Sequence, residues 1–339
     1  MPGARYNSRL LELTPIAAVD YLRARGLCPR SVIELGGGVS NAVLLVEHEA
    51  GRLVLKQSLA KLRVAEEWLS DRDRVFRESR ALRELASFLP PGSLPGVLWE
   101  DRDNFLFAME AAPPGAQPWK TALLAGDARP ETGAAAGRML RAMIQAGLNR
   151  PEWAASFGGE AVFDQLRLDP YYRFTASRHP ELAPQLLALI EAAKGRRVTL
   201  VHGDWSPKNL LVHGARVMAI DFEVFHFGDP GFDAAFLLNH LLLKSIHLPV
   251  HAVRYLEAAQ AFWEAAAGAP EWLPRSTLDH LGALLLARVD GKSPAEYLRA
   301  EDEKSRARAF AGELLRETPV DLGELWERWP CRDRPRNGR

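Results

Sequence analysis

The chain changes character at Pro113-Pro114-Gly115, and this change constrains the fold more than any other feature. Proline and glycine interrupt helices and strands alike, so the tripeptide predicts a linker. The sequence before it is mostly β-like, and the sequence after it is dominated by Ala- and Leu-rich segments with helical spacing. We therefore expect an α+β protein of two lobes, residues 1–112 and 113–330, followed by a frayed tail at 331–339.

The amino-terminal lobe is expected to hold a five-stranded antiparallel sheet with one internal helix. A first helix over Thr14–Leu27 begins with an N-cap residue and a proline. A strand, a glycine loop and two strands joined at Ala50-Gly51 follow it. Apolar residues at helical spacing predict the internal helix over Asp71–Leu89, and two more strands are expected at VLWED and NFLFAMEAA.

The carboxyl-terminal lobe is expected to be mainly helical, with helices over 131–147, 181–194 and most of 234–315. One β-rich stretch, residues 198–225, interrupts the helices, and its strands form a hairpin that turns at His213-Gly214. A layout of this kind predicts a cleft between the two lobes.

Charge and cysteine content exclude several classes of protein. The 339 residues include 43 basic and 43 acidic side chains, so no net field attracts the chain to nucleic acid or to a membrane surface. The longest apolar run, Ala234–Leu243, is too short to cross a bilayer, and the first residues lack the apolar core of a signal peptide. The two cysteines, Cys28 and Cys331, match no metal or redox spacing. We expect a cytoplasmic monomer or homodimer.

The segment VHGDWSPKNLLV, residues 201–212, contains Asp204 and, five positions later, Asn209. This is the spacing of a phosphotransferase catalytic loop, where the Asp orients or deprotonates a hydroxyl and the Asn amide oxygen binds magnesium. Asp221 follows the predicted hairpin, which brings it close to Asn209 as a second magnesium ligand. A turn capped by Asp and Asn is the alternative for the first pair alone, but the position of Asp221 favours the catalytic interpretation.

The amino-terminal half contains groups that such a site requires. The loop Leu35–Val43 allows backbone N–H groups to approach phosphate oxygens, although three glycines also form simple flexible turns. Its candidate phosphate-binding residues are Gly36, Gly37, Gly38, Ser40 and Asn41. Lys56 lies in an apolar strand and either faces solvent or is buried beside a carboxylate. Glu78 on the following helix is the first candidate partner, and Glu84 is the second.

The order of these motifs along the chain resembles the protein-kinase-like fold. With His-Gly-Asp at 202–204 and IDFE at 220–223, the chain is similar to the aminoglycoside phosphotransferase and choline kinase superfamily over Ile33–Tyr297. The resemblance implies ATP and Mg²⁺ as cofactors and assigns catalysis to Asp204 and Lys56, with Lys56 reaching the α- and β-phosphates. One segment, Val54–Leu82, also resembles methylthioribose kinases. Those enzymes typically read HGDLHTGS in the catalytic loop and lack the Gly-Asp-Pro found here at 228–230.

The same resemblance assigns supporting roles near the nucleotide. FAMEAAPPG corresponds to the hinge, where backbone groups of Glu110 and Ala112 read adenine. Phe107 or Met109 would pack on the adenine ring, or either could belong to the core.

Other residues are assigned to the catalytic loop and to the acceptor. His202 is expected to support the loop backbone, and Asp229 and Asp233 are implied to brace it. The acceptor candidates are Glu223, Trp205, Arg288 and Lys292. Glu223 could bind the metal instead. Arg288 or Lys292 would bind an anionic or sugar group of the acceptor.

These patterns predict an ATP- and Mg²⁺-dependent kinase that phosphorylates a hydroxyl of a small metabolite such as a sugar or an amino alcohol. Pockets for polycationic aminoglycosides are expected to be rich in carboxylates, whereas acidic and basic residues are mixed over Asp221–Leu298. The alternatives are an antibiotic phosphotransferase, a nucleotide-binding pseudokinase without turnover, and a non-catalytic interaction protein.

Overall fold

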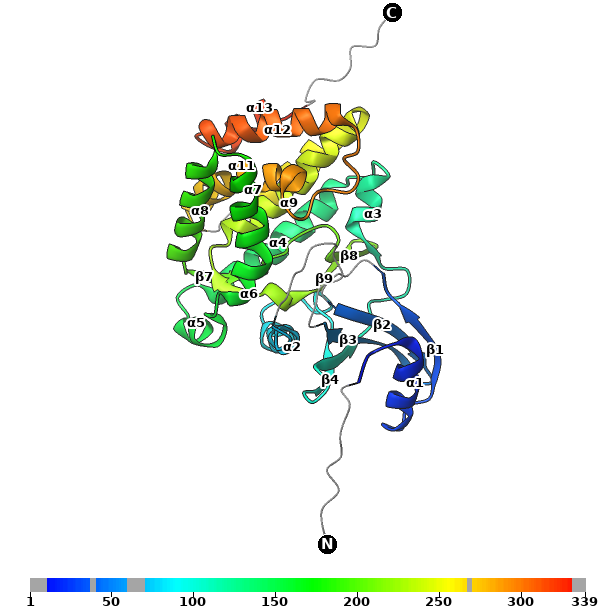
Figure 1. Ribbon diagram of the computed structural model, residues 1–339. Helices are drawn as coiled ribbons and strands as arrows, with labels where there is room; N and C mark the ends of the chain where they lie inside the picture. The colour runs from blue at the N-terminus through cyan, green and yellow to red at the C-terminus, as the bar shows by residue number, and fades with distance from the viewer. Residues whose placement is uncertain (1–10, 37–40, 60–70, 267–269, 331–339) are drawn as a thin grey trace, which may run out of the picture. The chain divides into compact units, whose positions relative to one another are not determined.

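The computed structural model describes residues 11–36, 41–59, 71–266 and 270–330, so the predicted tail lies outside the described residues. The chain divides into two compact units (Figure 1). Unit 1 comprises Met1–Arg83 and Pro95–Ala111, and unit 2 comprises Glu84–Leu94 and Ala112–Arg339.

The segment Glu84–Leu94 belongs to unit 2, although it lies within residues 1–112, which were expected to form the first lobe. Its contacts explain the difference. The carbonyl of Ser93 accepts a hydrogen bond of 2.8 Å from the N–H of Ala219, and the ring of Phe88 packs edge-on against Trp153.

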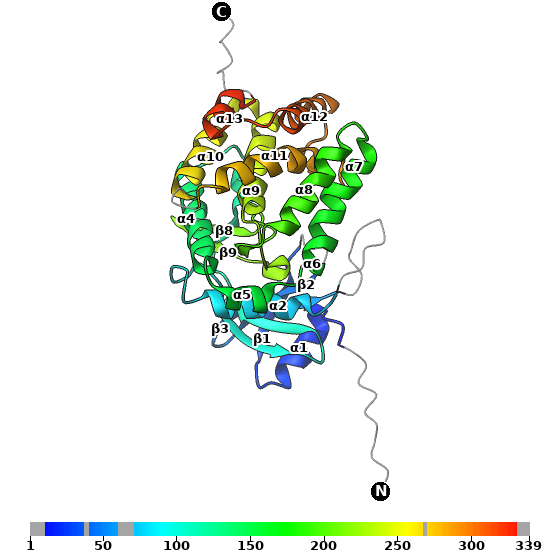
Figure 2. The same cartoon turned by 90° about the vertical axis from the view of Figure 1, so that its left-hand side faces the viewer.

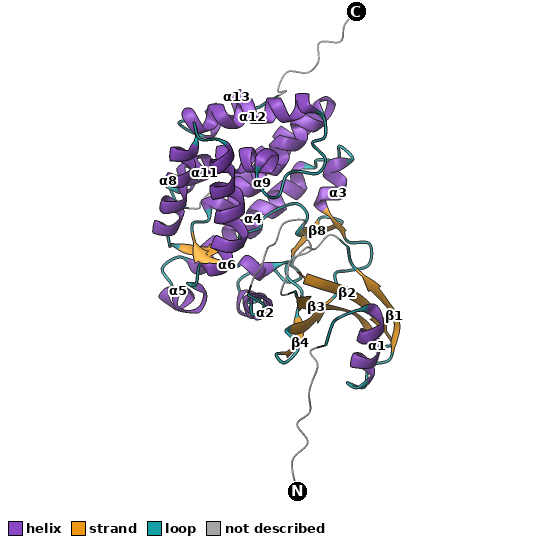
Figure 3. Cartoon of the chain, viewed as in Figure 1, coloured by secondary structure: helices purple, strands orange, loops and turns teal. Residues whose placement is uncertain are grey.

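Unit 1 contains the five-stranded antiparallel sheet that the sequence predicted (Figure 3). The strand order is β1-β2-β3-β5-β4, and all neighbouring strands are antiparallel. The strands are β1 (Pro29–Glu34), β2 (Asn41–His48), β3 (Gly51–Ser58), β4 (Val97–Asp101) and β5 (Leu106–Glu110). Lys56 therefore lies on the middle strand, where it pairs with Val43 on one side and with Phe107 on the other.

Apolar side chains of helix α1 (Pro15–Arg23) pack against this sheet. Leu22 of the helix, Leu44 and Leu55 are completely buried in one core cluster, and burial of one such side chain stabilises the fold by about 2 kcal/mol. The side chain of Thr14 caps the helix, as its sequence indicates, by accepting from the N–H of Ala17. The helix ends four residues before the predicted Leu27, because Gly26 adopts a left-handed conformation with φ of 76° that stops it.

Helix α2 (Arg74–Leu85) occupies the inner part of the predicted range Asp71–Leu89. Before it, the N–H of Asp73 donates to the carboxylate of Asp71, which holds the entry as a turn. Val75, Leu82 and Leu85 of this helix are buried.

Unit 2 is mainly helical, as the sequence predicted (Figure 2). Its α-helices are α3 (Trp119–Leu124), α4 (Pro130–Gly147), α5 (Pro151–Phe157), α6 (Ala161–Phe163), α7 (Phe174–Arg178), α8 (Ala183–Gly195), α9 (Gly231–His247), α10 (Ala252–Ala266), α11 (Leu273–Asp290), α12 (Glu301–Arg316) and α13 (Leu322–Arg328). A π-helix, η1 (Asp164–Arg173), and two short 3₁₀ turns, η2 (Phe222–Val224) and η3 (Pro249–His251), complete them.

Helix α9 is the centre of this unit and packs against both α10 and α11. Each of its residues from Gly231 to Ile246 is buried, as expected for a helix whose residues are mostly apolar, and the polar ones are buried with them. Helices α4 and α10 also pack closely, because Gly133 and Gly137 of α4 face the backbone carbonyls of Ala258 and Phe262.

Two small sheets interrupt the helices. Strand β7 (Thr199–Val201) pairs with β10 (His226–Gly228), and β8 (Leu210–His213) lies between β6 (Gln117–Pro118) and β9 (Arg216–Ala219). Strands β8 and β9 form the predicted hairpin, which turns at Gly214 with φ of 60°. Among the residues that the structure describes, no helix combines the length and the apolar composition needed to cross a membrane.

Candidate active site

The loop between β7 and β8 carries the His-Gly-Asp motif, and its backbone is fixed from several sides. Gly203 adopts φ of 76°, and a Cβ there would lie 2.7 Å from the side chain of Val224, so only glycine fits. Asp233, in the first turn of α9, accepts hydrogen bonds from the N–H groups of His202 at 2.6 Å and Gly203 at 2.9 Å. Asp233 thus braces the loop as the family resemblance implied.

Asp229, by contrast, braces a different part of unit 2. Its carboxylate contacts Arg196 at 2.9 Å, the hydroxyl of Ser276 at 2.7 Å and the ring of His280 at 3.6 Å. It also accepts from the N–H of Gly231. Asp229 therefore ties the start of α9 to α11, and the expectation that it braces the catalytic loop is wrong.

His202 supports the loop through both ring nitrogens. Nδ1 accepts a hydrogen bond of 3.1 Å from the N–H of Asp204, and Nε2 lies 3.0 Å from the carbonyl of Ile220. Complete burial lowers the pKa of His202 to about 4, so the ring is neutral at pH 7. A neutral ring that accepts at Nδ1 carries its proton on Nε2 and donates to Ile220, which leaves no proton-accepting nitrogen for a substrate.

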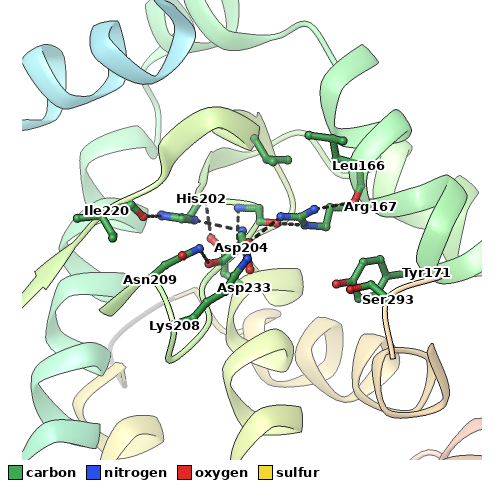
Figure 4. Close-up of polar contacts among 12 residues, drawn as sticks. Leu166, Arg167, Tyr171, His202, Asp204, Lys208, Asn209, Ile220, Asp233 and Ser293 are labelled. Carbon is green, nitrogen blue, oxygen red and sulfur yellow. Dashed lines mark hydrogen bonds and ion pairs between the residues drawn. The ribbon is translucent and has the colours of Figure 1, made fainter. Parts of the chain in front are cut away.

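Asp204 itself is buried, with 4% of its surface exposed, and is held between two cations (Figure 4). One carboxylate oxygen lies 2.9 Å from a guanidinium nitrogen of Arg167 and 2.9 Å from Nζ of Lys208. Burial acts to raise the pKa of Asp204, but the charges of Lys208 and Arg167 outweigh it and hold the pKa well below its ordinary value. The carboxylate is therefore ionised at any physiological pH.

Arg167 is a site residue that the sequence did not predict. It lies in the π-helix η1, and its Nε donates to the carbonyl of Gly203 at 2.5 Å while another nitrogen donates to the carbonyl of Leu166. It precedes Asp204 by 37 positions, in a segment whose sequence does not mark it as a site residue. Lys208 was also missed, although its position four residues after Asp204, inside the catalytic motif, was a readable signal.

Asn209 and Asp221 are the predicted magnesium ligands. The side-chain amide of Asn209 donates to the carbonyl of Asp204 at 3.0 Å, which orients its oxygen away from that contact. A backbone hydrogen bond brings their chain segments together, because the N–H of Ile220, the residue before Asp221, donates to the carbonyl of Asn209. No cluster of three or more Asp, Glu, His or Cys suited to a metal occurs among the described residues. One carboxylate and one amide oxygen still suit Mg²⁺, which retains water and takes further ligands from phosphates.

Asp221 adopts the left-handed conformation, with φ of 70° and ψ of 56°. Asp tolerates this region better than most side chains, but the conformation is strained by about 1 kcal/mol and is found most often at functional sites. Glu223 follows it in η2 rather than on a strand, and it is buried rather than solvent-facing. Glu223 thus lies outside any strand although it belongs to the β-rich stretch 198–225, because the left-handed residue before it leads the chain into a 3₁₀ turn.

In unit 1, Lys56 and Glu78 form the ion pair that the sequence predicted. Lys56 Nζ on β3 lies 2.5 Å from Oε2 of Glu78 on α2. Both side chains are almost completely buried, with 5% and 0% exposed. Glu78, the first candidate, is therefore a partner of the lysine.

The glycine loop is described only at its ends. Gly36 follows β1, and Asn41 is the buried first residue of β2, whereas Gly37, Gly38 and Ser40 lie outside the described residues. At the predicted hinge, Phe107 and Met109 are buried on β5. The N–H of Glu110 donates to the carbonyl of Gly96, so a backbone contact from Glu110 to adenine would use its carbonyl. Ala112 follows this strand in the sequence.

The predicted acceptor residues lie in unit 2. Trp205 is buried and packs edge-on against His202. Arg288 on α11 is buried and donates to the hydroxyl of Ser293 at 3.0 Å and to the hydroxyl of Tyr171 at 3.5 Å. Lys292 forms an ion pair of 3.1 Å with Asp169, close to the surface.

A comparison with protein families decides the class of this site. The profile of the phosphotransferase enzyme family, APH, matches residues 31–266, which is more than half of the chain. The chain belongs to this family.

Two methylthioribose kinases are similar in sequence. That of Yersinia enterocolitica is 27% identical over 278 residues, covering 71% of this chain and 68% of the relative, and that of Pectobacterium atrosepticum is 27% identical over 265 residues, covering 68% and 66%.

Solved structures of kinases share the fold of this phosphotransferase. An amicoumacin kinase in complex with AMP-PNP, Ca²⁺ and Ami superposes with a TM-score of 0.56 at 18% identity, covering 90% of this chain and 96% of that chain. An aminoglycoside phosphotransferase of Alicyclobacillus acidocaldarius superposes with a TM-score of 0.55 at 15% identity, covering 95% and 99%. The predicted superfamily, its kinase-like α+β fold and the prediction of a small-molecule kinase are confirmed.

Proposed function

We propose that this phosphotransferase uses Mg²⁺ and ATP to phosphorylate a hydroxyl group of a small metabolite. The observation that carries the proposal is the state of Asp204, a buried and ionised carboxylate between Arg167 and Lys208 on a loop that Asp233 holds in place. A fixed anion of this kind suits the positioning of a hydroxyl donor.

Asp204 is assigned to orient the acceptor. Its low pKa makes it a weak proton acceptor, so it binds the hydroxyl as a hydrogen-bond acceptor and takes the proton late in the transfer. The acceptor oxygen bonds to the γ-phosphorus as the bond from phosphorus to ADP breaks. A loose transition state of this type gains more from positioning and charge neutralisation than from a strong base.

Asn209 and Asp221 are assigned to Mg²⁺, which when bound would neutralise phosphate charge. Lys56, held in place by Glu78, is assigned to the α- and β-phosphates, together with backbone groups of the glycine loop from Gly36 to Asn41. Residues 1–112 would accordingly form the nucleotide lobe and residues 113–330 the catalytic lobe. We place the reaction in the cytoplasm, where ATP and Mg²⁺ are available.

The similarity to methylthioribose kinases supports a hydroxyl acceptor of sugar type, and the fold shared with aminoglycoside phosphotransferases keeps an antibiotic as the alternative. ADP release in the presence of Mg·ATP and a panel of sugars, sugar acids, amino alcohols and aminoglycosides tests the proposal. We expect turnover with at least one metabolite. An enzyme that is stabilised by Mg·ATP but releases no ADP with any acceptor would be a pseudokinase.

The metal assignment has its own test in the same assay. Asp221→Ala should raise the Mg²⁺ concentration for half-maximal rate at least tenfold, because one of two protein ligands is lost. Asp127→Ala, which removes a surface carboxylate paired with Arg129, is the matched control and should leave the Mg²⁺ dependence unchanged. An unchanged Mg²⁺ dependence of the Asp221 variant would show that this carboxylate does not bind the metal.

A further inference from the structure

Helix α9 buries a lysine that forms no ion pair with a carboxylate of the described residues. Lys244 is 1% exposed. Among the described residues, no carboxylate oxygen lies within ion-pair distance of its Nζ, and its single hydrogen bond, of 3.3 Å, goes to the carbonyl of His240 in the same helix. A buried ammonium without a counter-ion destabilises a fold by several kcal/mol, so its presence needs an explanation.

The surroundings of Lys244 are cationic and aromatic. Nζ lies 4.7 Å from the ring centre of Tyr297, and burial, followed by the charges of Arg288 and Lys120, lowers the pKa of Lys244 to about 7. Glu296 is the one carboxylate of the described part that counteracts this effect, and it forms an ion pair with Lys120. In the part of the chain that the structure describes, Lys244, Arg288 and Lys120 thus share the carboxylate of Glu296.

Several buried hydrogen-bonding atoms near this lysine also lack partners within the described residues. They are Nε of Arg288, Nδ1 of His240 and the hydroxyl of Tyr297. Arg288 is 8% exposed and makes its other contacts with the neutral groups of Ser293 and Tyr171. Buried polar atoms are almost always hydrogen-bonded in native proteins, so three unsatisfied groups beside an unpaired lysine indicate a site for a polar ligand.

The cluster is connected to Asp204 within unit 2. The guanidinium of Arg167 lies 5.9 Å from the rings of both Tyr171 and Phe236, and Arg288 contacts the hydroxyl of Tyr171. Phe236 packs in turn on His240, one helical turn before Lys244. Aromatic side chains therefore link the residue assigned to the acceptor hydroxyl with the unpaired cations.

We propose that Lys244, Arg288 and Tyr297 form the acceptor subsite and bind an anionic group, a carboxylate or a phosphate, of the hydroxylated acceptor. This inference rests on the proposed phosphotransferase function and names its substrate class. An anion would supply the missing counter-ion of Lys244 and accept from Nε of Arg288 and from the Tyr297 hydroxyl. A polycationic aminoglycoside would add positive charge to the same place and be repelled.

Anion binding can be measured independently of turnover. With the nucleotide site filled by Mg·ADP, D-glycerate, glycerol 3-phosphate and inorganic phosphate are titrated by calorimetry into the full-length protein. We expect at least one of the three to bind, and Lys244→Met to weaken that binding at least tenfold. Lys304→Met, the same substitution at a half-buried lysine of α12, should leave it unchanged. Absence of binding for all three anions, or equal affinity of the Lys244 variant, would overturn the inference.

Turnover then separates this inference from the proposed function. Matched acceptors are compared by ADP release: glycerol with glycerate and glycerol 3-phosphate, and ribose with ribose 5-phosphate. We expect kcat/KM to be at least tenfold higher for a charged member of a pair and Lys244→Met to remove this preference by raising KM. Equal or better use of the neutral members would refute the anionic subsite while leaving the kinase activity established.

Discussion

At the scale of single residues, the candidate site depends on how charge is placed around Asp204. Arg167 connects this carboxylate to the carbonyl of Gly203, and Asp233 holds the N–H groups of the same loop. The loop is thereby fixed from both η1 and α9 before any substrate binds, and such preorganisation is what a positioning mechanism requires.

Arg167→Met should therefore destabilise the protein. It leaves a buried carboxylate with one cation fewer and the Gly203 carbonyl without its donor, and removal of one partner of a buried pair costs about 3–5 kcal/mol. Arg173→Met, in the same helix, is the control, because its pair with Asp164 is about one-third exposed and contributes about 1 kcal/mol or less. Urea unfolding compares the two variants, and equal effects would contradict the role given to Arg167.

Lys244→Met should have the opposite effect on stability. The pKa of Lys244 is about 7 in the folded protein and about 10.4 in an unfolded chain. Below pH 7 both states carry the proton and the folded state bears the full penalty of a buried charge. Between pH 7 and 10.4 only the unfolded state keeps the proton, so the wild type gains stability as pH rises.

The variant should thus be more stable than the wild type by about 1–3 kcal/mol at pH 6, and the difference should shrink towards pH 10. Three nearby groups, Glu296, His240 and Tyr297, do not change charge in this window. Burial opposes ionisation of Glu296, but its pair with Lys120 outweighs this and lowers the pKa of Glu296, so it stays anionic, while burial lowers the pKa of His240 and raises that of Tyr297, which keeps both neutral. Denaturant unfolding at both pH values checks this, and a variant less stable at pH 6 would show that Lys244 has a structural partner.

The site residues that the sequence predicted are those that lie close together along the chain. Asp204, Asn209 and Asp221 lie within 18 positions of one another, and Lys56 and Glu78 follow each other on consecutive elements. Arg167 reaches Asp204 only through tertiary folding, and nothing in DQLRLDPYYR distinguishes it from a surface arginine. Lys244 could be noticed in the sequence as a lysine at the end of an apolar run. Its cationic surroundings could not be predicted, because they depend on Lys120 of α3 and Arg288 of α11.

At the scale of elements, close contacts between helices hold unit 2 together. Gly137 on α4 leaves no room for a side chain, since a Cβ there would lie 2.1 Å from the carbonyl oxygen of Phe262 on α10. Gly137→Ala should force the two helices apart and destabilise the protein by about 1–3 kcal/mol.

Gly195→Ala is the matched control for this prediction. Gly195 ends α8, and a Cβ there would have no atom within 4 Å, so the change should be neutral or stabilise by about 0.5 kcal/mol. Thermal unfolding of both variants measures the difference. A loss no greater for Gly137→Ala than for the control would contradict the close packing of α4 on α10.

Element types were predictable, but their ends and irregularities were not. The five strands of unit 1 and the hairpin of β8 and β9 follow from β-rich runs and turn residues. The π-helix η1 could not be foreseen, because i→i+5 pairing has no compositional signature and Pro170 within it indicates a break. The 3₁₀ turn at Phe222–Val224 likewise depends on the left-handed conformation of Asp221 rather than on its sequence.

At the scale of the whole molecule, the two units are assigned different substrates. Unit 1 provides the buried Lys56–Glu78 pair, which is assigned to the nucleotide, and unit 2 provides Asp204, which is assigned to the acceptor. Changes in unit 2 at Asp204 should therefore affect turnover without affecting nucleotide affinity.

The most direct measurement is the steady-state turnover of Asp204→Asn and Asp204→Glu, together with calorimetric titration of Mg·ATP. We predict that kcat falls by about 10²–10⁴-fold in both variants. Asparagine removes the negative charge, and glutamate moves the carboxylate by the length of one methylene group. The dissociation constant for Mg·ATP should change by less than about threefold. A folded Asp204→Asn enzyme with kcat within tenfold of the wild type would contradict the role of Asp204 on which this account rests.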